Sequence, residues 1–248
     1  MLEQARTRTE LFVESFRILY GSNDPYANEK NGYNRIFLRM LSDLAPRLDD
    51  PAEALKILSW ANSVDIPAPW YAVAPRDILE GATPVGLGFR EAVKLVSTAK
   101  RIAIVLDNAG EAVVDIAYAI KLANKGVEVA LAARSKPYEV DVTVAEAKKL
   151  VEIVSRELGV SKPDIEVYGT GTHYPPTAVS EVTSVLNTFD AILVKGIANL
   201  EAFIEYKLLD PNRTIILFRA KCPVLSSIFG VPLKTPIIAH ARRVLEVV

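Results

Sequence analysis

Residues 101–133 read RIAIVLDNAGEAVVDIAYAIKLANKGVEVALAA, and this stretch decides the fold class. Residues 101–107 and 127–133 are short apolar runs with β-branched side chains, and a helical stretch at 110–125 separates them. Neither run alternates strictly between apolar and polar residues, so we expect strands that are covered on both faces. A strand, a helix and a second strand in this order predict two parallel strands joined by a right-handed crossover.

The same alternation continues towards the C-terminus. Further strands are expected at 164–169, 191–196 and 214–220, with longer helices at 144–158 and 198–209. The sequence therefore predicts an α/β fold, a mostly parallel sheet with helices on both faces. Ligands of such sheets bind beyond the carboxyl ends of the strands, so a functional site is expected there.

The region before the sheet is predicted to be helical. Apolar residues recur at helical spacing around Phe12 and Phe37, and Asp50 followed by Pro51 predicts the start of a third helix. A segment rich in proline and glycine follows, which is typical of a bridge between two parts of a chain. The predicted division is a helical subdomain (1–68), a connecting segment (69–99) and an α/β domain that carries the site (100–248).

Composition excludes several classes of partner. Twenty-nine Lys and Arg balance thirty Asp and Glu, and the basic residues are scattered, so we expect neither nucleic acid nor a membrane surface as a partner. No signal peptide and no apolar run of about eighteen residues is present, so we expect a cytoplasmic protein. Cys222 is the only cysteine, which excludes an internal disulfide and a cysteine-based zinc cluster. The oligomeric state does not follow from the sequence.

Oxygen-bearing side chains follow the first two expected strands. Asp107 and Asn108 end the first strand, and Asp141 follows the second, shortly before Thr143 and a helix. Adjacent parallel strands lie about 4.8 Å apart, so side chains on their end loops can converge on one ion. Carboxylate and amide oxygens suit a hard divalent cation such as magnesium or manganese. The alternative is that these residues, or Thr143, only cap the helices that follow.

The later strand ends carry groups that suit an anion. Gly169-Thr170-Gly171 would let backbone N–H groups approach a phosphate, although an ordinary turn explains the glycines as well. Lys195, with Asn199 just inside the next helix, and Lys221 would add positive charge near the same edge. Acids first and lysines later are what metal-assisted phosphoryl chemistry requires.

The order of these motifs resembles the metal-dependent damage-control phosphatase family with the ARMT-like fold. The motifs that carry the resemblance are NDPYANEKNGYNR (23–35), ANSVD (61–65), DNAGE (107–111), SKPYEVDVT (135–143), KGIANLE (195–201) and RAKCPV (219–224). The resemblance implies that Asp107, Asn108 and Asp141 ligate the metal, which would be Mn, Ni, Co or Mg. It places further site residues around the same cleft: Asn62, Asp65, Glu111, Lys195, Asn199 and Lys221.

The resemblance also implies an activity, the hydrolysis of phosphate monoesters of small metabolites such as sugar phosphates or damaged cofactor precursors. Asp107, Asn108, Glu111 and Lys195 would then be the catalytic set. The chain departs from the family pattern twice. It lacks the Cys-x-x-Cys that related small members often carry near the N-terminus, and Val140 stands where many members have Asn before the late aspartate.

Two other functions remain open from the residues alone. An S-adenosylmethionine-dependent methyltransferase has a similar strand and helix order, but its glycine-rich first loop is represented here only by Gly110, and Arg134 with Ser135 replaces the acidic residue after the second strand. A non-catalytic protein that binds a phosphorylated metabolite would show the same strand ends. His173, in the glycine-containing loop, is a weaker candidate for a proton donor.

Overall fold

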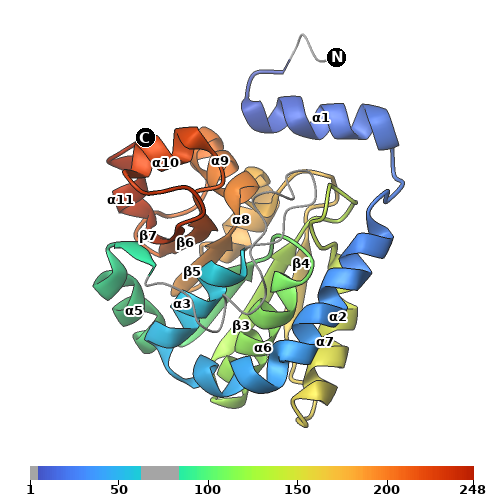
Figure 1. Cartoon of the computed structure of the whole chain (residues 1–248), viewed down its shortest axis with the longest axis vertical. Helices are drawn as coiled ribbons and strands as arrows, with labels where there is room; N and C mark the ends of the chain where they lie inside the picture. The colour runs from blue at the N-terminus through green and yellow to red at the C-terminus, as the bar shows by residue number, and fades with distance from the viewer. Residues whose placement is uncertain (1–4, 63–83) are drawn as a thin grey trace.

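A computed structural model describes residues 5–62 and 84–248 of the chain. Its centre is a seven-stranded sheet in the order β1-β7-β6-β5-β2-β3-β4 (Figure 1). The strands are β1 (Val85–Leu87), β2 (Arg101–Val105), β3 (Glu128–Ala133), β4 (Glu166–Gly169), β5 (Ala191–Lys195), β6 (Thr214–Arg219) and β7 (Pro236–His240). All pairs between β6 and β4 are parallel, whereas β7 runs antiparallel to β6 and carries β1 parallel to itself. The predicted fold class is confirmed.

Helices cover both faces of this sheet. The helices of the described residues are α1 (Arg8–Tyr20), α2 (Ala27–Leu44), α3 (Pro51–Ala61), α5 (Phe89–Thr98), α6 (Glu111–Asn124), α7 (Val144–Glu157), α8 (Ser180–Leu186), α9 (Ile197–Tyr206), α10 (Pro223–Phe229) and α11 (Ala241–Leu245), and all but α1 pack on the sheet. Side chains along β2 alternate between two cores. Ile102 and Ile104 pack with α2, α3, α5, α6 and α7, while Ala103 and Val105 pack with α8, α9, α10 and α11.

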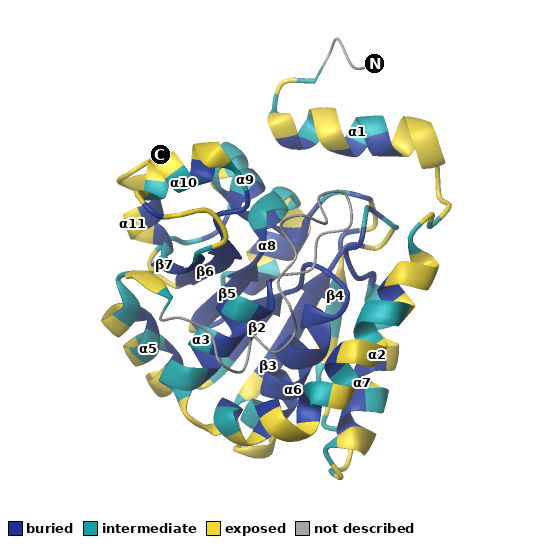
Figure 2. Cartoon of the chain, in the orientation of Figure 1, coloured by how far each residue is buried: buried dark blue, intermediate teal, exposed yellow. Residues whose placement is uncertain are grey.

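Burial follows this layered arrangement. The residues of β2 and β5 are buried almost throughout, and the central strands and α6 are dark blue in Figure 2, as expected for strands covered on both faces. Helix α1 differs, because it lies at one end of the molecule and much of its surface is exposed (Figure 2). No helix within residues 5–62 and 84–248 is long and apolar enough to cross a membrane.

Several expected element boundaries hold. Asp50 caps α3, its Oδ1 accepting a hydrogen bond from the Glu53 N–H at 2.8 Å, and Pro51 occupies the first turn as predicted. Strands β1 and β7 were not expected, and β1 lies inside the segment predicted as a connection. Strand β1 forms an edge of the sheet and pairs with β7, which lies far away in the sequence, whereas β7 lies between β1 and β6. The division into 1–68, 69–99 and 100–248 stays a prediction, and α2 and α3 share a core with β2.

The strand order creates one switch point. From β2 the chain moves outward through β3 and β4, and it then returns to place β5 on the other side of β2. The crossovers on the two sides therefore diverge at the carboxyl ends of β2 and β5, which leaves a crevice there. Asp107 follows β2 and Gly196 follows β5, so both lie at this crevice.

Candidate metal and phosphate site

The two acidic segments pair with each other directly after their strands. Asn108 and Asp141 form an antiparallel bridge, the Val142 N–H donates to the Asp107 carbonyl at 2.9 Å, and the Ala109 N–H donates to the Val140 carbonyl at 2.8 Å. This short pairing fixes the backbone on both sides. Asp107 and Asn108 are thus brought beside Asp141.

Helix capping does not occupy these three side chains. Thr143 caps α7 in a reciprocal capping box with Glu146, and the position before α6 is Gly110, which has no side chain to offer. The side chains of Asp107, Asn108 and Asp141 therefore do not cap α6 or α7. All three are buried and line one cavity.

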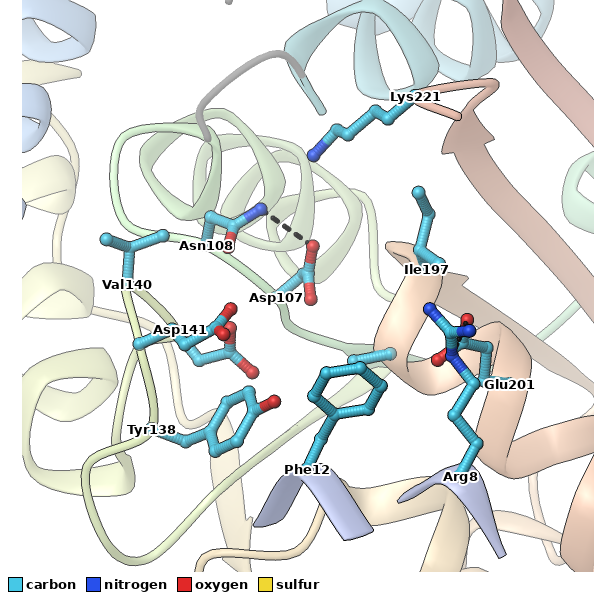
Figure 3. Close-up of a pocket in the computed structure, with 12 residues that line it drawn as sticks. Arg8, Phe12, Asp107, Asn108, Tyr138, Val140, Asp141, Ile197, Glu201 and Lys221 are labelled. Atoms are coloured by element: carbon cyan, nitrogen blue, oxygen red, sulfur yellow. Dashed lines mark hydrogen bonds and ion pairs between the residues drawn. The ribbon is translucent and has the colours of Figure 1, made fainter. Parts of the chain in front are cut away.

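The cavity has a volume of about 240 Å³ and lies at the switch point (Figure 3). It is lined by Arg8, Phe12, Asp107, Asn108, Tyr138, Glu139, Val140, Asp141, Ile197, Ala198, Glu201 and Lys221. Figure 3 shows the Asp107 and Asp141 carboxylates and the Lys221 ammonium pointing into the same space. Lys221 comes from the loop after β6, so these three charged groups come from three separate strand ends.

The charges at this end of the cavity are incompletely balanced. Burial raises the pKa of Asp107 well above its usual value, and repulsion by Asp141 and then Glu111 raises it further against the opposing effect of Lys221. Asp141 pairs through Oδ2 with the guanidinium of Arg134, which also donates to the His173 carbonyl. Within the described ranges, the Oδ1 atoms of Asp107 and Asp141 accept no hydrogen bond.

A network beneath the cavity holds Asp107 in place. Asn62 Nδ2 donates to Asp107 Oδ2 at 2.9 Å and to Glu111 Oε1 at 2.7 Å, and Asn108 Nδ2 donates to the same two oxygens at 2.8 and 3.0 Å. Glu111 is fully buried and forms an ion pair with Lys195 at 2.8 Å. The Asp107 carboxylate is therefore held by the side-chain amides of Asn62 and Asn108, and both amides also donate to the buried Glu111.

Gly196 forms the other side of this support. It has φ +82°, and a Cβ placed there would lie 1.9 Å from Asp107 Oδ2 and 2.1 Å from Cγ. The Asp107 carboxylate thus packs directly against the backbone of the loop after β5. Both the left-handed φ and the close approach require glycine at this position.

Comparison with known proteins shows the family of this chain. A model of the damage-control phosphatase ARMT1-like domain matches residues 4–237. The chain belongs to this family. It is also similar to an uncharacterized protein of Methanocaldococcus jannaschii, with 26% identity over 85% of this chain and 71% of that one. The crystal structure of a DUF89 family protein from Pyrococcus horikoshii has the same fold, with a TM-score of 0.69, 23% identity, and coverage of 92% of this chain and 79% of that one.

Members of the ARMT1-like family are metal-dependent phosphatases. Groups of three or more His, Cys, Asp or Glu that could share one ion do not occur in the part of the chain that the structure describes. The predicted set contains only two carboxylates, with the Asn108 amide as the third donor. Two mutually repelling carboxylates, each with one oxygen that has no partner among the described residues, fit a hard cation.

In this ARMT1-like protein, Lys195 lies away from the cavity. Its ammonium contacts Glu111, Asp115 at 2.9 Å and the Leu58 carbonyl at 2.7 Å, and its side chain is completely buried. Burial alone would lower the pKa of Lys195, but Asp115 and Glu111 outweigh it and raise the value. With its three donors engaged, Lys195 is placed to hold Glu111, and its predicted contact with phosphate stays a prediction.

Asn199 also lies beneath the cavity surface. Its Nδ2 donates to the Lys195 carbonyl at 2.9 Å and to the Leu106 carbonyl at 3.2 Å, and its Oδ1 accepts from Thr177. These bonds join the end of β5 to the end of β2. The substrate contact predicted for Asn199 is untested, and the observed contacts are those of a positioning residue.

The glycine turn is engaged by the neighbouring loop. The Gly171 N–H donates to Ser135 Oγ at 2.7 Å, and Thr170 Oγ1 accepts from the Ser135 N–H at 3.1 Å. A Cβ at Gly169 would lie 2.5 Å from Ser135 Oγ, so this glycine permits close packing of the two loops. None of the three residues lines the cavity, and their predicted role in phosphate binding stays a prediction.

His173 and Asp65 complete the predicted candidates. His173 lies outside the cavity lining, its Nε2 is 2.9 Å from the Gly21 carbonyl, and burial lowers its pKa. It therefore ties the 169–173 loop to the end of α1. Asp65 lies outside the described residues.

Sequence reasoning missed several residues of the site. Arg8 and Phe12 come from α1, Tyr138 from the loop before Asp141, and Glu201 from α9. The segments containing Tyr138 and Glu201 were already part of the family resemblance, so their motifs offered a signal. Arg8 and Phe12 offered none, because their position depends on how α1 docks.

Proposed function

We propose that this protein is a divalent-metal-dependent phosphatase that hydrolyses phosphate monoesters of small metabolites, such as sugar phosphates or damaged cofactor precursors. The observation that carries the proposal is the pairing of Asp107, Asn108 and Asp141 around one cavity that also receives Lys221. Family membership supports the reaction class, and the cavity at the switch point supports a small substrate.

The metal would be held by Asp107, Asn108 and Asp141, and Mn, Ni, Co and Mg all suit these oxygen donors. A bound cation supplies Lewis-acid polarisation of a phosphoryl oxygen. Lys221 would bind the phosphoryl group and stabilise the negative charge that develops on its oxygens. Burial of the cavity end strengthens each of these interactions relative to water.

The predicted catalytic set divides into two roles under this proposal. Asp107 and Asn108 face the substrate, while Glu111 and Lys195 keep their side chains oriented from below. A carboxylate packed against Gly196 and held by two amides loses little freedom when substrate binds, which favours catalysis by preorganisation. Asn62 belongs with Glu111 and Lys195, because its amide contacts Asp107 and Glu111.

The direct test is an assay of p-nitrophenyl phosphate and a panel of sugar phosphates with Mn, Co, Ni or Mg. We expect turnover that requires added metal and falls at least 100-fold in Asp107→Ala, which removes a ligand and a carboxylate at the reacting end. Asp164→Asn is the matched control, since Asp164 is exposed and lies outside the cavity. Full activity of Asp107→Ala would refute the assignment.

Binding measurements beside this assay distinguish a phosphatase from the two alternative functions. A non-catalytic binding protein would bind sugar phosphates stoichiometrically without turnover in any metal. A methyltransferase would bind S-adenosylmethionine in a calorimetric titration, and we expect no heat of binding.

A further inference from the structure

We infer that helix α1 forms the wall that selects the organic part of the substrate, with Arg8 and Phe12 as its specificity-determining residues. This inference rests on the proposed function, since it takes the phosphoryl group to lie at Asp107 and Lys221. It adds a second half to the binding site, opposite the acidic end.

The cavity has two chemically different ends. The residues described above form the acidic end, whereas Arg8 and Phe12 of α1 face Glu201, Ile197 and Tyr138 at the other (Figure 3). Figure 3 shows the Phe12 ring and the Tyr138 hydroxyl on the side of the cavity that faces Asp107. A molecule with its phosphate at the acidic end would therefore extend towards α1.

The end near α1 offers both polar and apolar contacts. Arg8 pairs with Glu201 at 3.0 Å, and its guanidinium carbon lies 4.9 Å from the centre of the Phe12 ring. Phe12 is 44% exposed, so a large part of its ring is available to a ligand. An aromatic face beside a charged pair and a phenol suits an organic group that has hydroxyls along one side and C–H groups along the other.

Helix α1 is docked through two anchors on either side of Phe12. At its N-terminus, the Arg8 and Thr9 N–H groups donate to the Glu205 carboxylate of α9 at 2.9 and 3.2 Å. Further along, Val13 and Phe16 pack on Tyr138, with ring centres of Phe16 and Tyr138 5.1 Å apart. Because one anchor is on α9 and the other on a cavity residue, α1 spans the cavity and is held in a defined place.

The experiment compares two substrates of different size in the manganese-loaded protein, a hexose phosphate and methyl phosphate. In Phe12→Ala and Arg8→Ala, we expect the ratio of kcat/KM for the hexose phosphate to that for methyl phosphate to fall about tenfold, the loss of one good contact. Leu19→Ala is the control on the same helix, because Leu19 is 73% exposed and does not line the cavity. Its ratio should stay at the wild-type value.

Calorimetry with the hexose phosphate and with inorganic phosphate supplies a second readout that needs no turnover. We expect the affinity for the hexose phosphate to fall about tenfold more than the affinity for phosphate in both variants. Equal losses for the two ligands, or no loss for either, would overturn the role of α1 even if the wild type is an active phosphatase. Absence of turnover with selective loss of hexose phosphate binding would refute the proposed function alone, and absence of all binding would overturn both.

Discussion

At the scale of single residues, the site depends on how closely groups approach Asp107. Gly196 shows this most directly, because the Asp107 carboxylate occupies the space that a Cβ at this position would fill. Beneath the cavity, two buried carboxylates, Glu111 and Asp115, form ion pairs with the same lysine, Lys195, and their pKa values shift in opposite directions. Each feature leads to a prediction with a matched comparison.

Replacing Gly196 with alanine should displace Asp107. We expect Gly196→Ala to lose at least 100-fold in activity and to lose manganese binding in calorimetry, since the added Cβ would lie 1.9 Å from Asp107 Oδ2. Gly126→Ala is the control. Gly126 has φ +85°, close to the +82° of Gly196, but nothing lies within 4 Å of its added Cβ. Both variants should be destabilised by about 1–3 kcal/mol through the positive φ, and only Gly196→Ala should lose function; equal activity in the two would contradict the role of Gly196.

Asp115 should make stability fall as the pH rises. Lys195 cannot balance two buried carboxylates, and Glu111 also accepts three N–H groups, so its pKa is lowered by Lys195 and Lys221 despite burial. Burial then raises the pKa of Asp115 to about 7, with Lys195 only partly opposing it. A raised folded-state pKa means that stability is complete below the unfolded value near 4 and is lost as the pH rises towards 7. Urea unfolding across this range should show that decline in the wild type and a smaller one in Asp115→Asn; identical slopes would exclude Asp115 as its source.

At the scale of elements, α2 supports the loop at 107–110, where we propose that the metal binds, from outside. The Gly110 N–H donates to Asn34 Oδ1 at 2.7 Å, and a Cβ on Gly110 would lie 3.0 Å from the Phe37 ring. The first turn of α6 is therefore fixed by a helix that is remote in sequence. This contact links the segment containing Asn34 to a candidate site that α2 does not line.

Removing that hydrogen bond should weaken the site without removing any ligand. We expect Asn34→Ala to lower manganese affinity about tenfold and to cost about 1 kcal/mol in unfolding free energy, because a buried loop N–H loses its acceptor. Asn31→Ala is the matched control, since Asn31 is an exposed residue on the same helix. Calorimetric titration with manganese measures the effect, and equal affinities in the two variants would show that α2 does not position the loop.

Sequence patterns predicted the elements whose signals are local. The strand ends of β2 and β3, the cap at Asp50 and the fold class could be read from runs of neighbouring residues. The role of Lys195 was harder to predict, because a phosphate-binding lysine is also expected at the end of a strand. Ala191 and Leu193 pack in the core beneath α3 and α6, and the period of two places Lys195 on that same face. Asp115, four residues after Glu111, could have been found from helical spacing. Strands β1 and β7, and the position of α1, depend on contacts between distant segments.

At the scale of the whole molecule, the cavity brings two repelling carboxylates together. Asp107 and Asp141 line the same space and are both buried, and repulsion by Asp141 contributes to the raised pKa of Asp107. A bound divalent cation would offset this repulsion and stabilise the folded state by mass action.

Metal addition should therefore raise the melting temperature. At a manganese concentration about 100 times the Kd, the stabilisation is about 2.7 kcal/mol, which corresponds to roughly 5–10 °C for a chain of this size. Asp107→Asn and Asp141→Asn should lose most of this shift, whereas Asp164→Asn should keep it. Removal of metal by a chelator should return the wild type to its original melting temperature, and a shift of equal size in all the variants would place the ion elsewhere.

The pairing of β1 with β7 has a consequence for how the chain is built. Val85 pairs with Ile237, so all the residues between them must be synthesised before this edge of the sheet can form. Such distant pairing slows folding, and the apolar surfaces of α3 and α5 that pack at this edge would stay uncovered until β7 has been synthesised. The nascent protein is therefore exposed to aggregation and to chaperones in the interval before β7 emerges from the ribosome.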